Sequence, residues 1–384
     1  MSDDIVLLAS SARDLQRQMT ALSAFCSESH MRINVQKTKV LVFNGGRNPR
    51  ANVVVDGCPV ECVSSFRYLG LTVDRCKGFG TAPAAVASAA LQAACGLMGR
   101  VRDREVNQIW LRVSLFSSFV MPGMQYGCEV WSTAYLLNAS KPLDNPLQSV
   151  QTQFLRQIGG QWLRRSTNTK MLMAEFGCRP VSWQWCKLVC RYWNHLVSQR
   201  HNPLLQSAFR AELDQAAQGV AGWGRDVLCM IQQVAPETAT AATEAISSQQ
   251  WDQLPQLQVD EFMLSWRRVW WTWPAAGCDP AVEPGPLAAY VAWMSADVEK
   301  PAPYVDLCEP IDTDLLMGLM RFRLGAHHFR VSTGRWDGTA RADRLCCKCA
   351  HHAVEDEQHV LFECPYYDSI RLRYATLYEA ADGS

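Results

Sequence analysis

Residues 1–10 read MSDDIVLLAS and place two adjacent carboxylates, Asp3 and Asp4, directly before an apolar run. That run, residues 5–8, is aliphatic without alternation, which is typical of a strand buried on both faces of a sheet. Aspartates at the tip of such a strand fit divalent-metal chemistry, because hard cations such as Mg²⁺ prefer carboxylate oxygens on a rigid mount. Taken alone, the same stretch also fits a solvated chain terminus.

The residues that follow predict that this stretch opens a mixed unit of one helix and a small sheet. Ser11, with Asp14 three residues later, is typical of a helix start, and apolar residues then recur at helical spacing, namely Leu15, Met19, Leu22 and Phe25. Apolar runs at 53–55 and 60–63 flank Asp56-Gly57, which predicts a β-hairpin. We therefore expect the helix to lie on the sheet.

Composition limits the class of protein. With 384 residues, 48% hydrophobic and 19% charged, the chain is typical of a globular protein of more than one domain. Because 37 basic residues balance 37 acidic ones, no global basic field attracts nucleic acid, and such binding would depend on local patches.

The cysteines and the apolar runs bear on location. The 16 cysteines are mostly scattered singly, which favours reduced thiols and an intracellular protein, nuclear or cytoplasmic. The first residues carry aspartates where a secretory signal carries cations, and we find no unbroken apolar run long enough to span a bilayer, so no membrane contact is expected.

Near the C-terminus, two short-range pairs of potential metal ligands follow one another. Cys346 and Cys349 form a Cys-x₂-Cys pair, and His359 and Cys364 form a His-x₄-Cys pair. This set predicts one tetrahedral Zn²⁺, and four protein ligands leave no position for a substrate, so the site is expected to be structural. Cys347 competes with Cys346 for the first ligand position.

Basic and aromatic residues alternate in the middle of the chain. Between residues 156 and 200 the only acid is Glu175, whereas the cations include Arg156, Arg164, Arg165, Lys170, Arg179, Lys187 and Arg191. Interleaved tryptophans and a tyrosine make the segment a candidate nucleic-acid patch, since cations neutralise phosphates while flat rings stack on bases. Amphipathic helices with aromatics inside and arginines outside would give the same pattern.

Three stretches in the first 70 residues carry a family resemblance together. The step from Ser2-Asp3-Asp4 into an apolar run, residues 34–39 (NVQKTK) and residues 66–70 (FRYLG) resemble, in order and spacing, three palm motifs of LINE-type (non-LTR) retrotransposon reverse transcriptases. In that family the first motif is Phe/Tyr-Ala-Asp-Asp, and here Met1-Ser2 stands in place of the aromatic-alanine pair.

The resemblance implies roles for these residues. Asp3 and Asp4 would hold part of the Mg²⁺ site, and Lys37 would act on the leaving group. The primer end would be gripped by four residues of the third motif: Phe66, Tyr68, Leu69 and Gly70. The implied partners are an RNA template and a DNA primer or target; the sequence names no protein partner.

The resemblance also implies an order of domains. We expect an α+β protein with a partial reverse-transcriptase palm at 1–80, thumb-like helices at 81–140, a helical connector with the basic patch at 141–300, and a C-terminal region with the zinc knuckle at 301–384. Residues 323–328 (RLGAHH) and 333–336 (TGRW) are similar to the flank of the family's C-terminal knuckle.

The expected function is that of a fragment of an RNA-directed DNA polymerase. The resemblance places the fingers and a further metal-binding aspartate on earlier strands, so we expect little or no polymerase activity from these 384 residues alone. The alternative is a non-catalytic nucleic-acid-binding remnant with a structural zinc knuckle. A chain that fails to fold stably is a third possibility, since an incomplete palm leaves an unpaired sheet edge.

Overall fold

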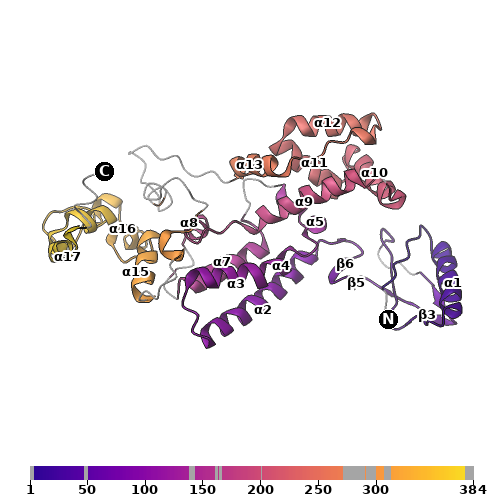
Figure 1. Cartoon of the computed structure of the whole chain (residues 1–384), viewed down its shortest axis with the longest axis horizontal. Helices are drawn as coiled ribbons and strands as arrows, with labels where there is room; N and C mark the ends of the chain where they lie inside the picture. The colour runs from indigo at the N-terminus through magenta and orange to yellow at the C-terminus, as the bar shows by residue number, and fades with distance from the viewer. Residues whose placement is uncertain are drawn as a thin grey trace.

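The computed structural model describes residues 4–46, 51–137, 143–160, 163, 167–199, 201–270, 290, 300–306 and 313–376. Figure 1 shows a small N-terminal unit around α1 at one end, a group of helices from α2 to α13 in the middle, and a C-terminal region from α15 to α17 at the other end. In the described part, helices predominate and the strands form small two-stranded sheets, which confirms the α+β prediction.

The N-terminal unit has the predicted helix and hairpin. Helix α1 (Ala12–Glu28) begins at Ser11, whose hydroxyl accepts a hydrogen bond of 3.1 Å from the backbone N–H of Asp14. Strands β2 (Val54–Val55) and β3 (Cys58–Pro59) are antiparallel, and the turn between them has positive φ at Asp56 and Gly57. Strand β1 (Lys39–Leu41) pairs in parallel with β4 (Glu61–Val63). Their small core consists of Met19, Val40, Val53, Val55 and Val60.

Residues 5–8 differ from the prediction, because they form no strand. Ile5 is 58% exposed and Leu8 is 75% exposed, whereas Leu7 alone packs partly against the small core. A strand exists only where a neighbour accepts its backbone hydrogen bonds, and the β1–β4 sheet does not extend to this stretch. The apolar run is therefore neither buried nor paired.

Helices make up the middle and C-terminal parts. They are α2 (Ala82–Asp103), α3 (Ile109–Phe119), α4 (Met121–Gln125), α5 (Cys128–Trp131), α6 (Thr133–Leu136), α7 (Pro146–Ile158), α8 (Thr169–Glu175), α9 (Val181–Ser198), α10 (Pro203–Ala217), α11 (Trp223–Val234), α12 (Pro236–Ser247), α13 (Val259–Trp270), α15 (Thr313–Arg323), α16 (Arg330–Thr333) and α17 (Asp368–Arg373). Helices α2 to α6 thus lie in the range 81–140, for which helices were expected.

Helix α9 lies at the centre of the main core. Trp185 and Trp193 are fully buried, and each indole N–H donates to a backbone carbonyl, that of Met124 at 3.2 Å and that of Pro255 at 2.9 Å. Because a buried indole needs such a partner, these bonds fix the helix against segments more than 60 residues away. Trp183, Trp185 and Trp193 of the predicted basic patch are core residues.

Helix α2 has a further property. Among the described helices it alone is long and apolar enough to cross a membrane by length and composition, a test that core helices of other proteins also pass. From the sequence we considered only unbroken apolar runs and therefore did not mark this helix.

A buried carboxylate joins the C-terminal region to the helices. Glu175, at the end of α8, is completely buried and accepts hydrogen bonds from the hydroxyls of Tyr290 and Tyr304. Arg323, at the end of α15, donates from Nε at 2.6 Å and from a terminal nitrogen at 3.3 Å. Burial first, and then the charge of Glu175, raises the pKa of both tyrosines, so both keep the protons that they donate. We call these four residues the Glu175 cluster.

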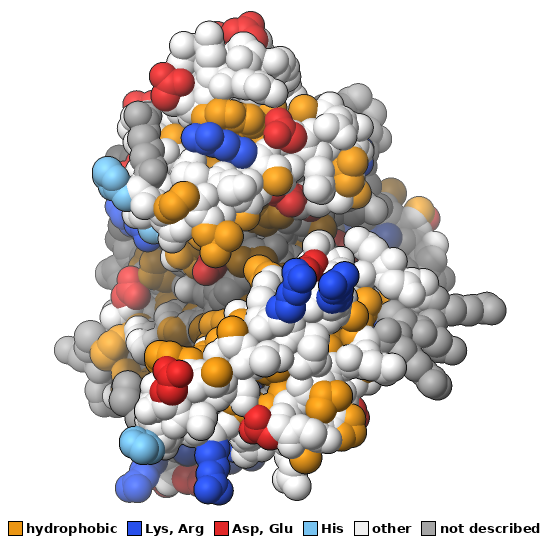
Figure 2. All heavy atoms as spheres, turned by 90° about the vertical axis from the view of Figure 1, so that its right-hand side faces the viewer, with side chains coloured by type: hydrophobic (Ala, Val, Ile, Leu, Met, Phe, Trp, Pro, Cys, Tyr) orange, Lys and Arg blue, Asp and Glu red, His pale blue; other side chains and the backbone are white. Residues whose placement is uncertain are grey.

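Charges on the surface are mixed. Figure 2 shows lysine, arginine and acidic side chains among neutral ones on the face that carries the N-terminal unit, with apolar side chains exposed between them, some of them in groups. This distribution agrees with the balanced net charge.

Candidate metal centre and nucleic-acid interface

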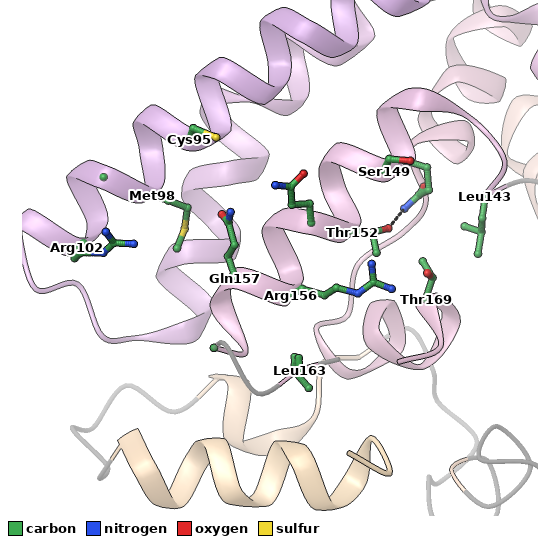
Figure 3. Close-up of a pocket in the computed structure, with 14 residues that line it drawn as sticks. Cys95, Met98, Arg102, Leu143, Ser149, Thr152, Arg156, Gln157, Leu163 and Thr169 are labelled. Atoms are coloured by element: carbon green, nitrogen blue, oxygen red, sulfur yellow. Dashed lines mark hydrogen bonds between the residues drawn. The ribbon is translucent and has the colours of Figure 1, made fainter. Parts of the chain in front are cut away.

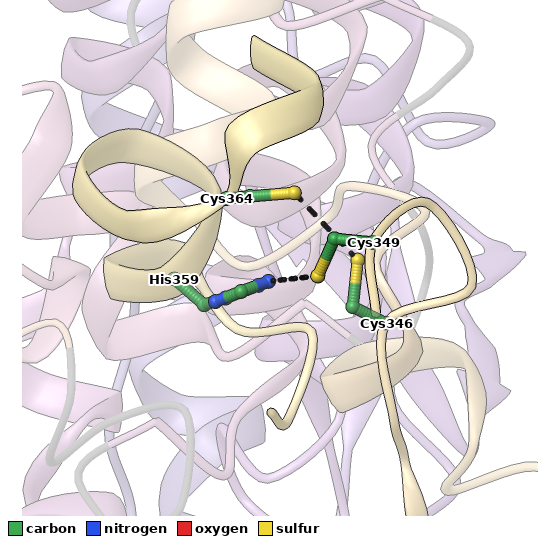
Figure 4. A group of neighbouring side chains, drawn as sticks. All are labelled: Cys346, Cys349, His359 and Cys364. Carbon is green, nitrogen blue, oxygen red and sulfur yellow. Dashed lines mark hydrogen bonds between the residues drawn. The ribbon is translucent and has the colours of Figure 1, made fainter. Parts of the chain in front are cut away.

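The four predicted zinc ligands lie together. The sulfurs of Cys346, Cys349 and Cys364 and a ring nitrogen of His359 are all within 4.8 Å of one another. Figure 4 shows Cys346 and Cys349 on one loop, facing His359 and Cys364 on the neighbouring turn. The sulfurs of Cys346 and Cys364 are 3.9 Å apart, and the sulfur of Cys349 is 3.3 Å from Nε2 of His359.

These distances fit a tetrahedral ion. With Zn–S near 2.3 Å and Zn–N near 2.0–2.1 Å, a tetrahedron places two sulfurs about 3.8 Å apart and a sulfur and a nitrogen about 3.5 Å apart. Cys347 is exposed and does not belong to the group. Three sulfurs and an imidazole can therefore hold a borderline-soft cation such as Zn²⁺ without rearranging the backbone.

Backbone hydrogen bonds hold the ligands in place. The N–H of Cys346 donates to the carbonyl of Ala353 at 2.8 Å, and the N–H of Lys348 points to the Cys346 sulfur at 3.4 Å. The N–H of Cys364 donates to the carbonyl of His359 at 2.7 Å and closes a single π-helical turn, His359–Glu363. The second pair of ligands thus sits on one closed loop of backbone.

Electrostatics differ among the four ligands. Burial raises the pKa of the Cys346 thiol to about 11, whereas the backbone N–H of His351 is the main cause that lowers the pKa of Cys349. The other ring nitrogen of His359, Nδ1, lies 3.5 Å from a carboxylate oxygen of Glu363. This atom has no hydrogen-bond partner among the described residues, and Glu363 is the nearby carboxylate that could accept from it and orient the ring toward a metal.

Two buried side chains, Glu355 and Arg344, join the loop of the four potential ligands to α16 and the residues after it. Glu355 accepts from the backbone N–H of Arg330 at 2.9 Å through its carboxylate and from that of Val331 at 3.1 Å through its carbonyl. The buried guanidinium of Arg344 donates to the carbonyls of Val331 and Thr339. These bonds fix the loop that carries Cys346 to residues 330–339, which include residues 333–336 of the stretches similar to the flank of the family's knuckle.

The four residues of the expected primer grip lie on one hairpin. Strands β5 (Ser65–Tyr68) and β6 (Leu71–Asp74) are antiparallel, and Leu69 and Gly70 form the turn with φ of 46° and 84°. The hydroxyl of Tyr126, just after α4, donates to the carbonyl of Leu69 at 2.6 Å. A Cβ on Gly70 would lie 3.2 Å from the Tyr126 ring, so this turn position favours glycine for space as well as for conformation.

Tyr126→Phe is expected to loosen this hairpin without unfolding the helices. The change removes one hydrogen bond worth about 0.5–1.5 kcal/mol, and the ring is already 53% exposed. Amide hydrogen exchange should then be faster in β5 and β6, while exchange in α9 stays as in the original protein. Tyr374→Phe, at another exposed tyrosine, is the matched control, and equal exchange in both variants would contradict the anchoring role.

The remaining polymerase residues are less well placed. Asp3 lies outside the described residues, and Asp4 is exposed. Lys37 is exposed in a turn, where its backbone N–H donates to Asn34. In the part of the chain that the structure describes, only the Cys346 set forms a group of three or more potential metal ligands.

The basic patch divides into two parts. Arg164 and Arg165 lie outside the described residues. Trp183, Trp185 and Trp193 are buried, so the interpretation as a platform of bases stacked between cations is wrong for these rings. Their helical spacing carried the signal for a core, because an amphipathic helix turns its aromatics inward. Arg156 and Lys170 are half-buried, and burial lowers the pKa of Lys170.

Arg156 instead lines a pocket that sequence patterns did not reveal. An open cavity of about 950 Å³ lies between α2 and α7. Figure 3 shows Met98 and Arg102 of α2 across from Thr152, Arg156 and Gln157 of α7. One guanidinium nitrogen of Arg156 donates to the carbonyl of Thr167 at 3.1 Å. Two helices that meet only in the fold form this pocket, so no local motif marks it.

Comparisons with known proteins identify relatives of the chain. No family model matches it, and no solved structure matches it. It is 27% identical over 214 residues to a Drosophila melanogaster protein described as a probable RNA-directed DNA polymerase from transposon BS, a match that covers 53% of this chain and 22% of the relative.

Two further matches agree with the first. The RNA-directed DNA polymerase from the mobile element jockey of Drosophila melanogaster is 24% identical over 153 residues, 40% of this chain and 16% of the relative. A transposon-derived protein of Caenorhabditis elegans is 30% identical over 141 residues, 34% of this chain and 47% of the relative. The matches span less than a quarter of each polymerase and less than half of the third relative. The chain is thus a homologue of part of the RNA-directed DNA polymerases of non-LTR retrotransposons.

Proposed function

We propose that the chain is a fragment of a non-LTR retrotransposon reverse transcriptase. Residues 1–80 would be a partial palm, 81–140 thumb-like helices, 141–300 a helical connector and 301–384 a C-terminal region with a zinc knuckle. The observation that carries the proposal is the sequence similarity to two mobile-element polymerases. The contact between Tyr126 and the 65–74 hairpin supports the proposal, because this contact joins the expected primer grip to the helices of the expected thumb.

In RNA-directed DNA synthesis, the predicted site residues would have three different roles. Asp3 and Asp4 would hold part of the metal site, Lys37 would orient the leaving phosphates, and Phe66, Tyr68, Leu69 and Gly70 would position the primer end. Bound Mg²⁺ supplies activation of the primer hydroxyl and charge neutralisation on the leaving group. The nucleic-acid partners would be an RNA template and a DNA primer or target.

We also propose that Cys346, Cys349, His359 and Cys364 hold a structural Zn²⁺. The support is the tetrahedral fit of their spacing and the closed set of four ligands, which leaves no position for water or substrate. The metal would then fix the fold of the loop and would take no part in synthesis.

Primer extension tests the polymerase assignment. The isolated chain is expected to give no extension of a DNA primer on an RNA template, because the described residues bring no two further ligands to Asp4. A chimera in which this chain replaces the matching segment of the transposon BS polymerase should extend the primer in Mg²⁺.

Two variants of the chimera make the result specific. Asp4→Ala should abolish extension, whereas Glu28→Ala, at an exposed position of α1, should not. Extension by the isolated chain that Asp4→Ala removes would show that no further segment is needed. A folded chimera that binds template but never extends would reject the polymerase role.

The second candidate function is nucleic-acid binding without catalysis. Two observations favour it. Cys346, Cys349, His359 and Cys364 lie close enough together to hold a metal ion, whereas Asp4 is exposed and belongs to no group of potential metal ligands in the described part. Under this alternative the chain binds nucleic acid, and the chimera shows no synthesis that depends on Asp4.

A further inference from the structure

We propose that the pocket between α2 and α7 binds a single strand of nucleic acid through its sugar–phosphate backbone. This inference rests on the proposed function, and it assigns the strand to one place in the fold. We call the pocket the α2–α7 groove.

The charge of the groove favours an anion. Fourteen residues line it; they include Arg102 and Arg156 and no aspartate or glutamate. The whole chain has as many acids as cations, whereas the charged residues among those that line the cavity are both arginines. Arg102 is exposed in the last turn of α2, where it can contact a phosphate from water. Neutralising phosphates is the main source of affinity for nucleic acids.

Neutral donors and acceptors continue the same wall. Ser149, Gln153 and Gln157 are exposed and line the groove from α7 at successive spacings of four residues, beside the half-buried Arg156. Residues four apart share one face of a helix. Hydroxyl and amide groups of this kind bond phosphate and sugar oxygens, contacts that position a strand without reading its sequence.

The shape favours a strand bound by its backbone. The row from Ser149 to Gln157 extends roughly 12 Å at 1.5 Å per residue, which is long enough to contact more than one phosphate of a strand. No aromatic residue lines the groove, so bases find no ring on which to stack. Gly99 leaves the opposite wall open, because a Cβ built there meets no atom within 4 Å. The sugar–phosphate backbone of a bound strand can therefore approach α2 closely.

Binding of labelled oligonucleotides by the full chain tests the proposal. Fluorescence anisotropy with a short oligothymidylate, between about 50 and about 200 mM salt, gives the affinity and its slope against log salt. Arg102→Gln should weaken binding about fivefold and reduce the magnitude of the slope by about 0.7, the value for one phosphate contact on a single strand. Gln153→Glu, at an exposed position, should weaken binding at least as much by adding a negative charge to the groove.

Matched controls keep the test specific. Arg100→Gln changes an exposed arginine of α2 that does not line the groove, and Gln215→Glu adds the same charge on α10. Both should bind as the original chain does. Oligoadenylate should bind within about twofold of oligothymidylate, since the groove offers contacts to the backbone only. Thermal melting of each variant confirms that it is folded.

The outcomes separate this inference from the proposed function. If the original chain binds and both groove variants bind equally well, the strand lies elsewhere and only this inference falls. A strong preference for one base, or competition by thymidine 5′-phosphate as effective as that by the oligonucleotide, would also overturn it. If the original chain shows no binding at low salt, this inference and the candidate function of nucleic-acid binding without catalysis fall together, while the chimera still tests the polymerase assignment.

Discussion

Cys349→Ser is expected to remove zinc from the purified chain, whereas Cys347→Ser should leave one zinc per chain. Cys349 lies 3.3 Å from the His359 ring nitrogen inside the ligand group, and Cys347 is exposed outside it. The hard hydroxyl of serine is a poor ligand for this ion, and three remaining ligands do not close the tetrahedron. In small zinc domains the binding free energy is folding free energy, about 10–16 kcal/mol in isolated peptides.

Elemental analysis and hydrogen exchange together measure this effect. Besides its lost zinc, Cys349→Ser should show fast amide exchange across residues 345–364, and a chelator should produce the same change in the original chain. Glu363→Gln, which alters the carboxylate behind His359, should lower zinc affinity only about 10–100-fold. Far less than one zinc in the original chain, or full zinc in Cys349→Ser, would refute the metal assignment.

Arg323→Met should destabilise the chain by about 3–5 kcal/mol, the usual cost of removing one partner of a buried ion pair. Glu175 is completely buried, and the guanidinium of Arg323 bonds both of its carboxylate oxygens. Methionine fills much of the same volume but cannot donate a hydrogen bond. The carboxylate of Glu175 then keeps the hydroxyls of Tyr290 and Tyr304 as donors and loses its positively charged partner. Burial alone would lower the pKa of Arg323, yet its bond to Glu175 raises it, so the cation is firmly held.

Urea unfolding gives the size of this effect. The midpoint for Arg323→Met should fall clearly, while Glu261→Gln, at an exposed position of α13, should stay within about 0.5 kcal/mol. The double variant Glu175→Gln with Arg323→Met should lose less than the two single changes add up to, because each already breaks the same pair. Additive losses, or none, would show that the Glu175 cluster does not hold α8 to α15.

Features encoded by neighbouring residues could be predicted from the sequence. The start of α1 depends on Ser11 and Asp14, and the β2–β3 turn depends on the positive φ that Asp56-Gly57 tolerates. The two ligand pairs are also local, so their spacing sufficed to indicate a metal cluster. In each case the physics acts within a few residues.

Features that depend on distant partners could not be predicted in this way. Residues 5–8 have strand propensity but no described neighbour to pair with. Trp185 and Trp193 could be read as exposed or buried until the packing of α9 was known. Glu175 looked like a lone acid in a basic segment, yet its partners come from residues 115 to 148 positions later.

The bond from Tyr126 to Leu69 predicts how this turn tolerates change. The tyrosine hydroxyl meets a backbone carbonyl, so the bond itself does not depend on the side chain at position 69, where the φ of 46° favours glycine, asparagine or aspartate. Position 70 is restricted by space as well, because the same ring stands 3.2 Å from where a Cβ would lie. Among homologues that keep Tyr126, we expect residues that tolerate positive φ at position 69 and glycine at position 70, and only the steric restriction at position 70 should relax where the tyrosine is lost.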